Sequence, residues 1–458
     1  MDPRFLLARL ASSSIKSTLR VFGGGATAAP GLAAEYIDPK ALSKLTGHLS
    51  EIILVTGTNG KTTTSRIIGS ILDKAGSSYI HNREGSNLTR GILTSLFSNT
   101  SFFPNSEKPM ALLEVDEATL PSVISQTSPK VIVINNLFRD QLDRYGEVDS
   151  LRKIWHQSLR NLDSSTTLVL NADDPSVSHL GYGSKARVVY FGVEDTKVSL
   201  NKAPHASDFT SCIVCGGELV YGRVYLAHLG IYHCANCKHK RPKPNISAQN
   251  IRLLGTEGFK ALIDTPEGKF EIKMSLPGLY NIYNCLSAVS CAFALSQPLA
   301  KTIQALKGFE AAFGRTESIE IGGKRLFTAL AKNPAGFNEI IRTVFSTNKK
   351  RFVFIAINDY LADGTDVSWL WDVDFEQLKG KVEKIWISGV RAPDMSLRLK
   401  YAGISHDSLN TNLKETLEDA YTLLPQGETL FIFPTYTAML EIKKILAEKG
   451  YGRRFWEE

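Results

Sequence analysis

The chain has 458 residues, and because domains usually hold roughly 100 to 200 residues, we expect two or three of them. Hydrophobic residues make up 43% and charged residues 22%, which is typical of a globular protein and excludes a largely disordered one. The net charge of +7 slightly favours anionic ligands but does not by itself indicate nucleic acid. No apolar run approaches the roughly 20 residues of a membrane-spanning helix.

Residues 1–46 form an N-terminal arm. Its first part, residues 4–22, contains Arg4, Arg9, Lys16 and Arg20 among apolar residues at partly helical spacing, which predicts a short basic amphipathic helix. Such a helix packs on the body of a protein, contacts a membrane surface or belongs to a transit peptide. A secretory signal is not expected, because the basic segment is not followed by a compact apolar stretch and a small-residue cleavage site. We therefore expect a cytoplasmic protein, with peripheral contact at the inner face of the membrane left open.

The middle of the chain alternates short apolar runs with helical stretches. A run at 51–55 precedes a glycine-rich turn and a helical stretch at 63–74. This alternation predicts a largely parallel, doubly wound α/β sheet. Further runs of strand length occupy residues 110–115, 131–135, 168–170 and 188–190.

Two changes of pattern suggest the domain organisation. Between about 205 and 245 cysteine, glycine and lysine dominate, which indicates a small inserted module. A second α/β series begins at residue 326, with strands near 352–357, 384–388 and 429–434. We therefore expect a central domain over 47–325 and a C-terminal domain over 326–458.

The strongest motif for chemistry follows the first predicted strand. Glycines let backbone N–H groups approach phosphate oxygens, Lys61 can neutralise β- and γ-phosphates, and the Thr62 hydroxyl can bind Mg²⁺ at a helix N-terminus. The alternative, a structural turn before a helix, does not explain a Gly-Lys-Thr run between strand and helix. The predicted ATP-binding residues of the loop are Gly57, Thr58, Asn59, Gly60, Lys61, Thr62 and Thr63.

An acidic run ends the apolar strand at 110–115. Glu114, Asp116 and Glu117 follow one another closely there, and carboxylates opposite a phosphate loop are natural Mg²⁺ ligands. Glu114 is the predicted ligand. A solvated acidic strand end is the alternative interpretation.

Four cysteines in the inserted module have the spacing of a metal site. Cys212 and Cys215 form one CxxC pair, and Cys234 and Cys237 form the second. Two such knuckles can close a tetrahedral Cys₄ zinc site, and four protein ligands leave no open position, so the zinc would be structural. Disulfides are the alternative, but a reducing compartment favours metal-bound thiolates.

The shortened loop, in which Gly57 lies only three residues before Gly60, resembles that of the Mur ligase and folylpolyglutamate synthetase family. The runs 135–146, 170–175, 278–284 and 313–317 resemble the family in order and spacing, although Gln141 stands where the family has histidine. The resemblance implies that Asn281 and Asn284 lie near adenine. It also implies that Arg315 lies near phosphate or ribose.

The C-terminal half narrows the resemblance. The runs 330–336 and 358–376, together with the Cys₄ insertion, resemble the MurT-type subunits of lipid II isoglutaminyl synthase, whose C-terminal domain is Rossmann-like. The resemblance implies that Asp366 is catalytic, completing a Cys-His-Asp triad whose cysteine and histidine belong to a GatD-like glutaminase. Without the family, Asp366 reads as an N-cap before Ser368, and the two roles can coexist.

By this resemblance, the chain uses ATP and Mg²⁺ to amidate the D-glutamate α-carboxylate of the lipid II stem peptide through an acyl phosphate. A glutaminase needs an activated cysteine. Cys285 and Cys291 lie in an apolar helical run and are expected in the core, so ammonia must come from a partner or from solution. Two alternatives stay open: a ligase that adds an amino acid, and a P-loop NTPase whose zinc ribbon binds nucleic acid. Nucleic acid is not the expected partner.

Overall fold

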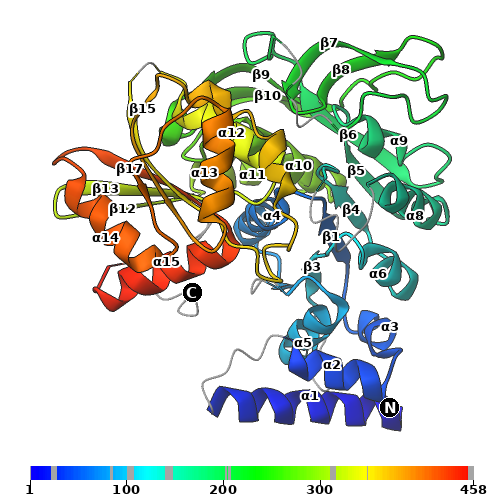
Figure 1. Cartoon of the computed structure of the whole chain (residues 1–458). Helices are drawn as coiled ribbons and strands as arrows, with labels where there is room; N and C mark the ends of the chain where they lie inside the picture. Colours follow the sequence, from blue (N-terminus) through cyan, green and yellow to red (C-terminus); the bar gives the residue numbers. More distant parts are fainter. Residues whose placement is uncertain are drawn as a thin grey trace.

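A computed structural model describes residues 2–21, 28–82, 86–100, 108–139, 148–201, 204, 208–309, 316–347 and 349–451 (Figure 1). Its central feature is a nine-stranded sheet in the order β11-β10-β9-β6-β5-β4-β1-β3-β2. In this sheet β9, β6, β5, β4, β1, β3 and β2 run parallel to one another, and β10 and β11 add an antiparallel edge beside β9. The predicted, largely parallel sheet is confirmed. Its strands are β1 (Ile52–Thr56), β2 (Tyr79–His81), β3 (Met110–Glu114), β4 (Val131–Ile134), β5 (Thr167–Asn171), β6 (Arg187–Val193), β9 (Ile246–Leu253), β10 (Phe259–Thr265) and β11 (Gly268–Met274).

Helices cover both faces of this sheet. On one face lie α4 (Lys61–Ala75), α10 (Leu279–Ala294) and α11 (Leu299–Lys307), whose apolar residues share a core with β1 and β6. Because β1 is covered on both faces, every residue from Ile52 to Thr56 is buried, as a continuous apolar strand requires. The opposite face carries α5 (Thr89–Asn99), α6 (Leu120–Gln126), α8 (Val148–Arg160) and α9 (Pro175–His179).

The N-terminal arm consists of α1 (Pro3–Val21), α2 (Ala29–Ile37) and α3 (Ala41–Thr46). The predicted helix is confirmed, and it packs on the body, because Phe5 and Ala8 are buried in the same core as α5. Leu7 and Leu10 lie on its outer side and are 57% and 47% exposed. Among the residues that the structure describes, no helix combines the length and apolar character needed to cross a bilayer.

The inserted module is an antiparallel hairpin of β7 (Leu219–Leu226) and β8 (Leu229–Cys234). It lies in the connection between β6 and β9, which are neighbours in the sheet. Tyr225, Leu226 and Leu229 at the hairpin end belong to the main core beside α10. The hairpin is therefore packed into the central domain.

The C-terminal domain is a second sheet in the order β12-β13-β17-β14-β15-β16. Helices α12 (Pro334–Val344) and α13 (Ala392–Tyr401) cover one face, and α14 (Leu413–Leu423) and α15 (Tyr436–Glu448) cover the other. The strands are β12 (Thr316–Ile321), β13 (Lys324–Ala329), β14 (Arg351–Ala356), β15 (Val382–Ser388), β16 (Ser408–Leu409) and β17 (Thr429–Pro434). The 3₁₀ helices η2 (Ser368–Asp372) and η3 (Phe375–Leu378) lie between β14 and β15, whereas η1 (Gly255–Glu257) lies between β9 and β10 of the central sheet.

The start of this second sheet differs from the sequence-based boundary near 325. β12 and β13 pair as an antiparallel hairpin, so the sheet begins at Thr316. β12 is thus joined to the C-terminal domain by hydrogen bonds, a pairing that strand pattern alone does not disclose.

Candidate active site

The phosphate loop lies between β1 and α4, at the carboxyl end of the central strand. In the sheet, β3 and β4 lie on opposite sides of β1, so the strand order reverses there. Ligands usually bind in the crevice at the carboxyl ends of the strands at such a point. Gly57 and Gly60 both have positive φ, at 129° and 85°. A Cβ on Gly60 would lie 2.0 Å from Asn284 Oδ1, so a side chain is excluded there.

Lys61 is the first residue of α4 and is 6% exposed. Its Nζ donates to Gly57 O and to Glu117 Oε1, each at 2.8 Å. Burial opposes the charge, but the carboxylates of Glu117 and Glu114 outweigh that effect and raise the pKa of Lys61 above its ordinary value. The ammonium group therefore stays charged at the position where phosphate oxygens would need it.

Thr62 and Glu114 are brought together as the sequence predicts. Thr62 Oγ1 donates to the Glu114 carboxylate, 2.9 Å from Oε2, because Glu114 pairs with Val55 across the β1–β3 ladder. A hydroxyl and a carboxylate oxygen beside a phosphate loop are hard donors that fit Mg²⁺. Thr63, the third residue of α4, is 9% exposed.

The polar side chains that follow β4 hold the loop in shape. Asn136 Oδ1 accepts from Asn59 N at 2.8 Å, and Asn136 O accepts from Thr58 N at 3.1 Å. Thr58 Oγ1 in turn accepts from Phe138 N at 2.9 Å. Residues 140–147, which include Gln141 at the position where the family has histidine, lie outside the described residues.

Asn281 and Asn284 lie together on the first turns of α10. Asn284 Nδ2 donates to Asn281 Oδ1 at 2.9 Å, and Asn284 Oδ1 accepts from Thr64 on α4 at 3.4 Å. Asn281 Nδ2 donates to Pro277 O at 2.7 Å. The structure therefore places Asn284 against the phosphate loop with Asn281 behind it, whereas Arg315 lies outside the described residues.

The C-terminal domain contacts the phosphate loop directly. Asn333, the N-cap of α12, donates to Asn59 Oδ1 at 3.0 Å, and Lys332 Nζ donates to Thr58 O at 3.2 Å. Between the loop and α12 is a small pocket that is partly open to solvent. Its walls are Asn59, Gly60, Asn136, Phe138, Leu226, Leu229, Tyr280, Tyr283, Asn284, Ala335, Gly336 and Glu339.

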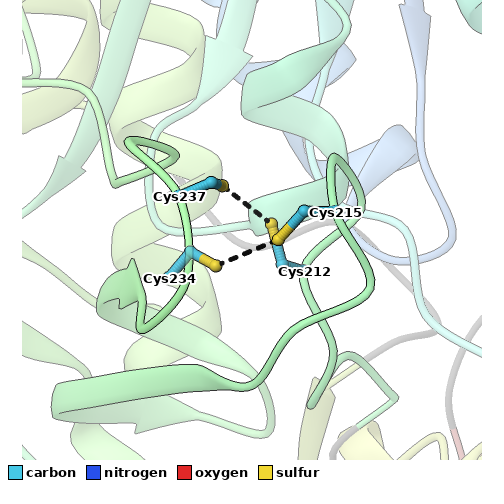
Figure 2. Close-up of side chains that lie close together, drawn as sticks. All are labelled: Cys212, Cys215, Cys234 and Cys237. Carbon is cyan, nitrogen blue, oxygen red and sulfur yellow. Dashed lines mark hydrogen bonds between the residues drawn. The ribbon is translucent and has the colours of Figure 1, made fainter.

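The four cysteines of the inserted module converge (Figure 2). Their sulfur atoms all lie within 4.8 Å of one another, with 3.7 Å between Cys212 and Cys237 and 3.4 Å between Cys215 and Cys234. Zn–S bonds of about 2.3 Å in a tetrahedron require sulfurs about 3.8 Å apart, so this set fits zinc. Backbone N–H groups in both knuckles point at the sulfurs, as those of Val214 and Asn236 do at 3.4 and 3.3 Å.

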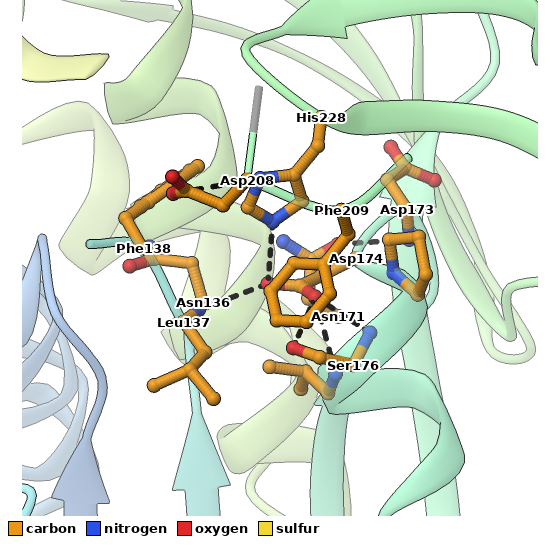
Figure 3. Close-up of polar contacts among 12 residues, drawn as sticks. Asn136, Leu137, Phe138, Asn171, Asp173, Asp174, Ser176, Asp208, Phe209 and His228 are labelled. Atoms are coloured by element: carbon orange, nitrogen blue, oxygen red, sulfur yellow. Dashed lines mark hydrogen bonds and ion pairs between the residues drawn. The ribbon is translucent and has the colours of Figure 1, made fainter. Parts of the chain in front are cut away.

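The turn of the hairpin is anchored by His228 (Figure 3). Its ring lies between Phe138 and Phe209, with centroids 4.8 and 4.9 Å away. His228 Nε2 lies 3.5 Å from Asp174 Oδ2. Burial alone would raise the pKa of Asp174, but His228 and hydrogen bonds to Ser176 hold that pKa below its usual value.

Arg241, in the basic segment after Cys237, forms ion pairs within the chain. Arg241 donates to Asp173 Oδ1 and to Glu194 Oε1, each at 2.6 Å, and its side chain is 7% exposed. Tyr283 donates to the other oxygen of Asp173 at 2.7 Å. Arg241 therefore ties the ribbon to the sheet and to α10.

Asp366 lies apart from these groups, on an exposed loop after β14. Its Oδ1 accepts from Ser368 N at 2.8 Å and its Oδ2 from Ser368 Oγ at 2.9 Å. The N-cap residue of η2 is Val367, however, so Asp366 holds the turn directly before the helix and does not occupy the predicted N-cap position. The loop is held by Asp363, which accepts from Thr437 N at 2.8 Å.

Sequence reasoning missed several residues around the site. Lys332 and Asn333 entered only as part of a resemblance, and Glu117 only as part of the acidic run. Asn136 likewise entered only as part of the run 135–146. Glu339 belongs to no motif, because its position depends on how α12 meets the loop. A regular α/β pattern gives no signal for such contacts.

Comparisons with known proteins agree with this architecture. Residues 55–292 match the Mur ligase middle domain, and residues 330–439 match the MurT ligase C-terminal domain. The chain is 32% identical to the "lipid II isoglutaminyl synthase (glutamine-hydrolyzing) subunit MurT" of Streptococcus pneumoniae strain R6, covering 99% of both chains. The chain belongs to the MurT family of Mur ligases. It is therefore an ATP-dependent ligase by family.

Two further comparisons extend this result. The MurT subunit of Staphylococcus aureus strain N315 is 33% identical, over 87% of both chains. A pseudomurein peptide ligase type C from Methanothermus fervidus has a TM-score of 0.69 at 22% identity, over 87% of this chain and 79% of that one. The first supports the family, and the second supports the fold alone.

Proposed function

We propose that the chain is the synthetase subunit of a lipid II isoglutaminyl synthase. It transfers the γ-phosphoryl group of ATP to the α-carboxylate of D-glutamate in the lipid II stem peptide, which releases ADP and forms an acyl phosphate. Ammonia from a GatD-like glutaminase then attacks the acyl carbon, and inorganic phosphate leaves as the amide forms. The observation that carries the proposal is the Lys61, Thr62 and Glu114 arrangement in a chain that matches MurT subunits over nearly its whole length.

The residues around the phosphate loop have complementary roles in this proposal. When bound, Mg²⁺ neutralises charge on the phosphates of ATP. Thr62 and Glu114 hold that ion, and Lys61 stabilises the charge on the transferring phosphoryl group. Gly57, Gly60 and the N–H groups at the start of α4 cradle the phosphates. Asn284 contacts the loop at Gly60 and Asn281 supports Asn284 from behind, so the adenine contact that the family resemblance implies for them stays a prediction.

The cysteines support a separate source of ammonia. Four of the six belong to the Cys₄ cluster, for which we propose a structural zinc ion. Cys285 and Cys291 are fully buried in α10, and burial raises the pKa of Cys285 to about 12. A thiol so placed does not supply a thiolate nucleophile. Asp366 is exposed and can meet the histidine of a partner.

A lipid-linked substrate would bring the protein to a membrane surface. The outer side of α1 exposes Leu7 and Leu10 beside Arg4, which supports peripheral contact there. Sedimentation with anionic vesicles, compared between the chain and its Leu7→Ser/Leu10→Ser variant, tests this contact. Equal sedimentation would contradict it.

The deciding experiment is product analysis. The purified chain is incubated with ATP, Mg²⁺ and lipid II, with ammonium or with glutamine plus the glutaminase subunit. Mass spectrometry of the stem peptide is expected to show amidation with both nitrogen sources. A product carrying an added amino acid would instead identify an amino-acid ligase, and an unchanged peptide despite ATP binding would contradict the proposed substrate.

A further inference from the structure

The pocket beside the phosphate loop is built from three parts of the chain. The central domain contributes Phe138 and Tyr280, the zinc-module hairpin contributes Leu226 and Leu229, and α12 contributes Glu339. Most of this wall is apolar or aromatic. In a wall of this kind the few polar groups decide which ligand groups are recognised.

Glu339 is an unusual member of that wall. It is 4% exposed, and its Oε1 accepts from Arg342 Nη1 at 3.3 Å. Its Oε2 is buried and has no hydrogen-bond partner within the described part of the chain. A buried carboxylate oxygen left without a donor is costly, so a ligand that supplies an N–H group would satisfy it.

Arg342 does not fill this role, because its guanidinium donates to backbone oxygens of the hairpin and of the segment that follows β6. Nη1 donates to Tyr225 O at 2.7 Å and Nη2 to Val198 O at 2.5 Å. These bonds hold α12 against the hairpin and fix Glu339 beside the pocket. Burial also raises the pKa of Glu339, and this rise is opposed by Arg342 and by a hydrogen bond from the backbone of Leu279 at the start of α10.

We infer that Glu339 selects the nucleotide base by accepting a hydrogen bond from the exocyclic amino group of an adenine-type purine. The inference rests on the proposed ATP site, because the pocket adjoins Asn59 and Gly60 of the phosphate loop. The ion pair with Arg342, at 3.3 Å, favours the ionised form of Glu339. An ionised carboxylate only accepts hydrogen bonds, so it favours an amino group and repels a keto oxygen at the same ring position. Base selection then comes from the C-terminal domain.

The test compares dissociation constants for Mg²⁺–ATP and Mg²⁺–ITP, in which a keto group replaces the amino group. For the full chain we expect ATP to bind roughly 10- to 100-fold more tightly, the usual discrimination of a buried hydrogen bond to a charged group. In Glu339→Gln the ratio should fall toward one, because the amide can donate to the keto oxygen. Glu441→Gln, an exposed position on α15, is the matched control and should keep the ratio.

A second measurement needs no substitution. Purine riboside triphosphate lacks the amino group, and the unmodified chain should bind it at least about tenfold more weakly than ATP. The inference is overturned if the unmodified chain binds ATP and this analogue equally well. It is also overturned if Glu339→Gln keeps the ATP/ITP ratio, including the case in which the variant loses affinity for both nucleotides equally. If the unmodified chain binds no nucleotide, the proposed function itself fails, so the two failures are distinguishable.

Discussion

Lys61 and Asp366 have opposite surroundings. Lys61 is enclosed and lies 2.8 Å from both Glu117 and Gly57 O. Asp366 stands on an exposed loop, and its hydrogen bonds given by the structure go to Ser368. The difference indicates that the proposed phosphate site is assembled within one chain, whereas the proposed glutaminase site is completed by a second one.

The largest expected effect lies at the exposed residue. Asp366→Asn should lower glutamine hydrolysis in the complex with the glutaminase on the order of 10⁴-fold, the loss seen when a triad aspartate becomes asparagine. Amidation driven by ammonium should persist, because Lys61 and Glu114 are unchanged. Glutamate release and amidated product are measured with each nitrogen source.

Ser368→Ala is the control for the capping role. It removes the hydroxyl that donates to Asp366 and leaves the carboxylate in place. We expect a much smaller loss of glutamine hydrolysis in this variant. Because asparagine caps almost as well as aspartate, unchanged hydrolysis in Asp366→Asn would leave Asp366 as a cap only.

The second effect lies at the enclosed residue. Lys61→Ala should reduce ATP hydrolysis by about 10²- to 10³-fold with either nitrogen source, the usual loss for one group that stabilises transition-state charge. It should also lower the free energy of unfolding by about 3 kcal/mol, because Glu117 keeps a buried charge without its ammonium partner. Stopped assays and denaturant titration measure both.

Lys74→Ala, an exposed lysine on the same helix, should change neither quantity. Normal ATP hydrolysis in Lys61→Ala would rule out the phosphate-loop assignment. If Lys61→Ala lowered only the glutamine-driven reaction, Lys61 would act like Asp366, and the proposed separation of the phosphate site from the glutaminase site would be wrong.

Much of this arrangement could be predicted from the sequence, because local patterns determine it. The apolar run before Gly57 and the helix after Gly60 gave β1 and α4, and the CxxC spacing predicted the sulfur cluster. The hairpin partner of β12, the contact of Asn333 with Asn59 and the burial of Glu339 depend on contacts between distant segments. A strand or helix pattern contains no information about such contacts.

The third effect lies in the β7–β8 hairpin, which lines the pocket beside the phosphate loop. Cys212→Ser should lose the bound metal and weaken nucleotide binding by about tenfold, because Leu226 and Leu229 would no longer be held against the pocket. Metal analysis and nucleotide titration measure the two losses. Cys285→Ser, in α10, should retain the metal, and equal metal content in Cys212→Ser and the unmodified chain would refute the site.

The smallest effect lies at a contact between the regions. Arg139 on the central domain lies 3.3 Å from Asp372, at the end of the 3₁₀ helix that Asp366 precedes. Both side chains are partly exposed, so Asp372→Asn should cost at most about 1 kcal/mol of unfolding free energy. Glutamine-dependent ATP hydrolysis should change less than fivefold, a bound of about 1 kcal/mol. A larger loss would mean that this ion pair couples the two sites strongly.

The position of the hairpin also affects the order in which the chain can fold. β6 and β9 are adjacent parallel strands, yet residues 194–245 separate them, where a helix would ordinarily make the crossover. Closing a long connection costs entropy, and each doubling of its length adds about 0.6 kcal/mol. Metal binding between Cys212–Cys215 and Cys234–Cys237 would shorten the connection before the strands meet. The edge formed by β9, β10 and β11 should therefore join the sheet late, and refolding without zinc should slow at that step.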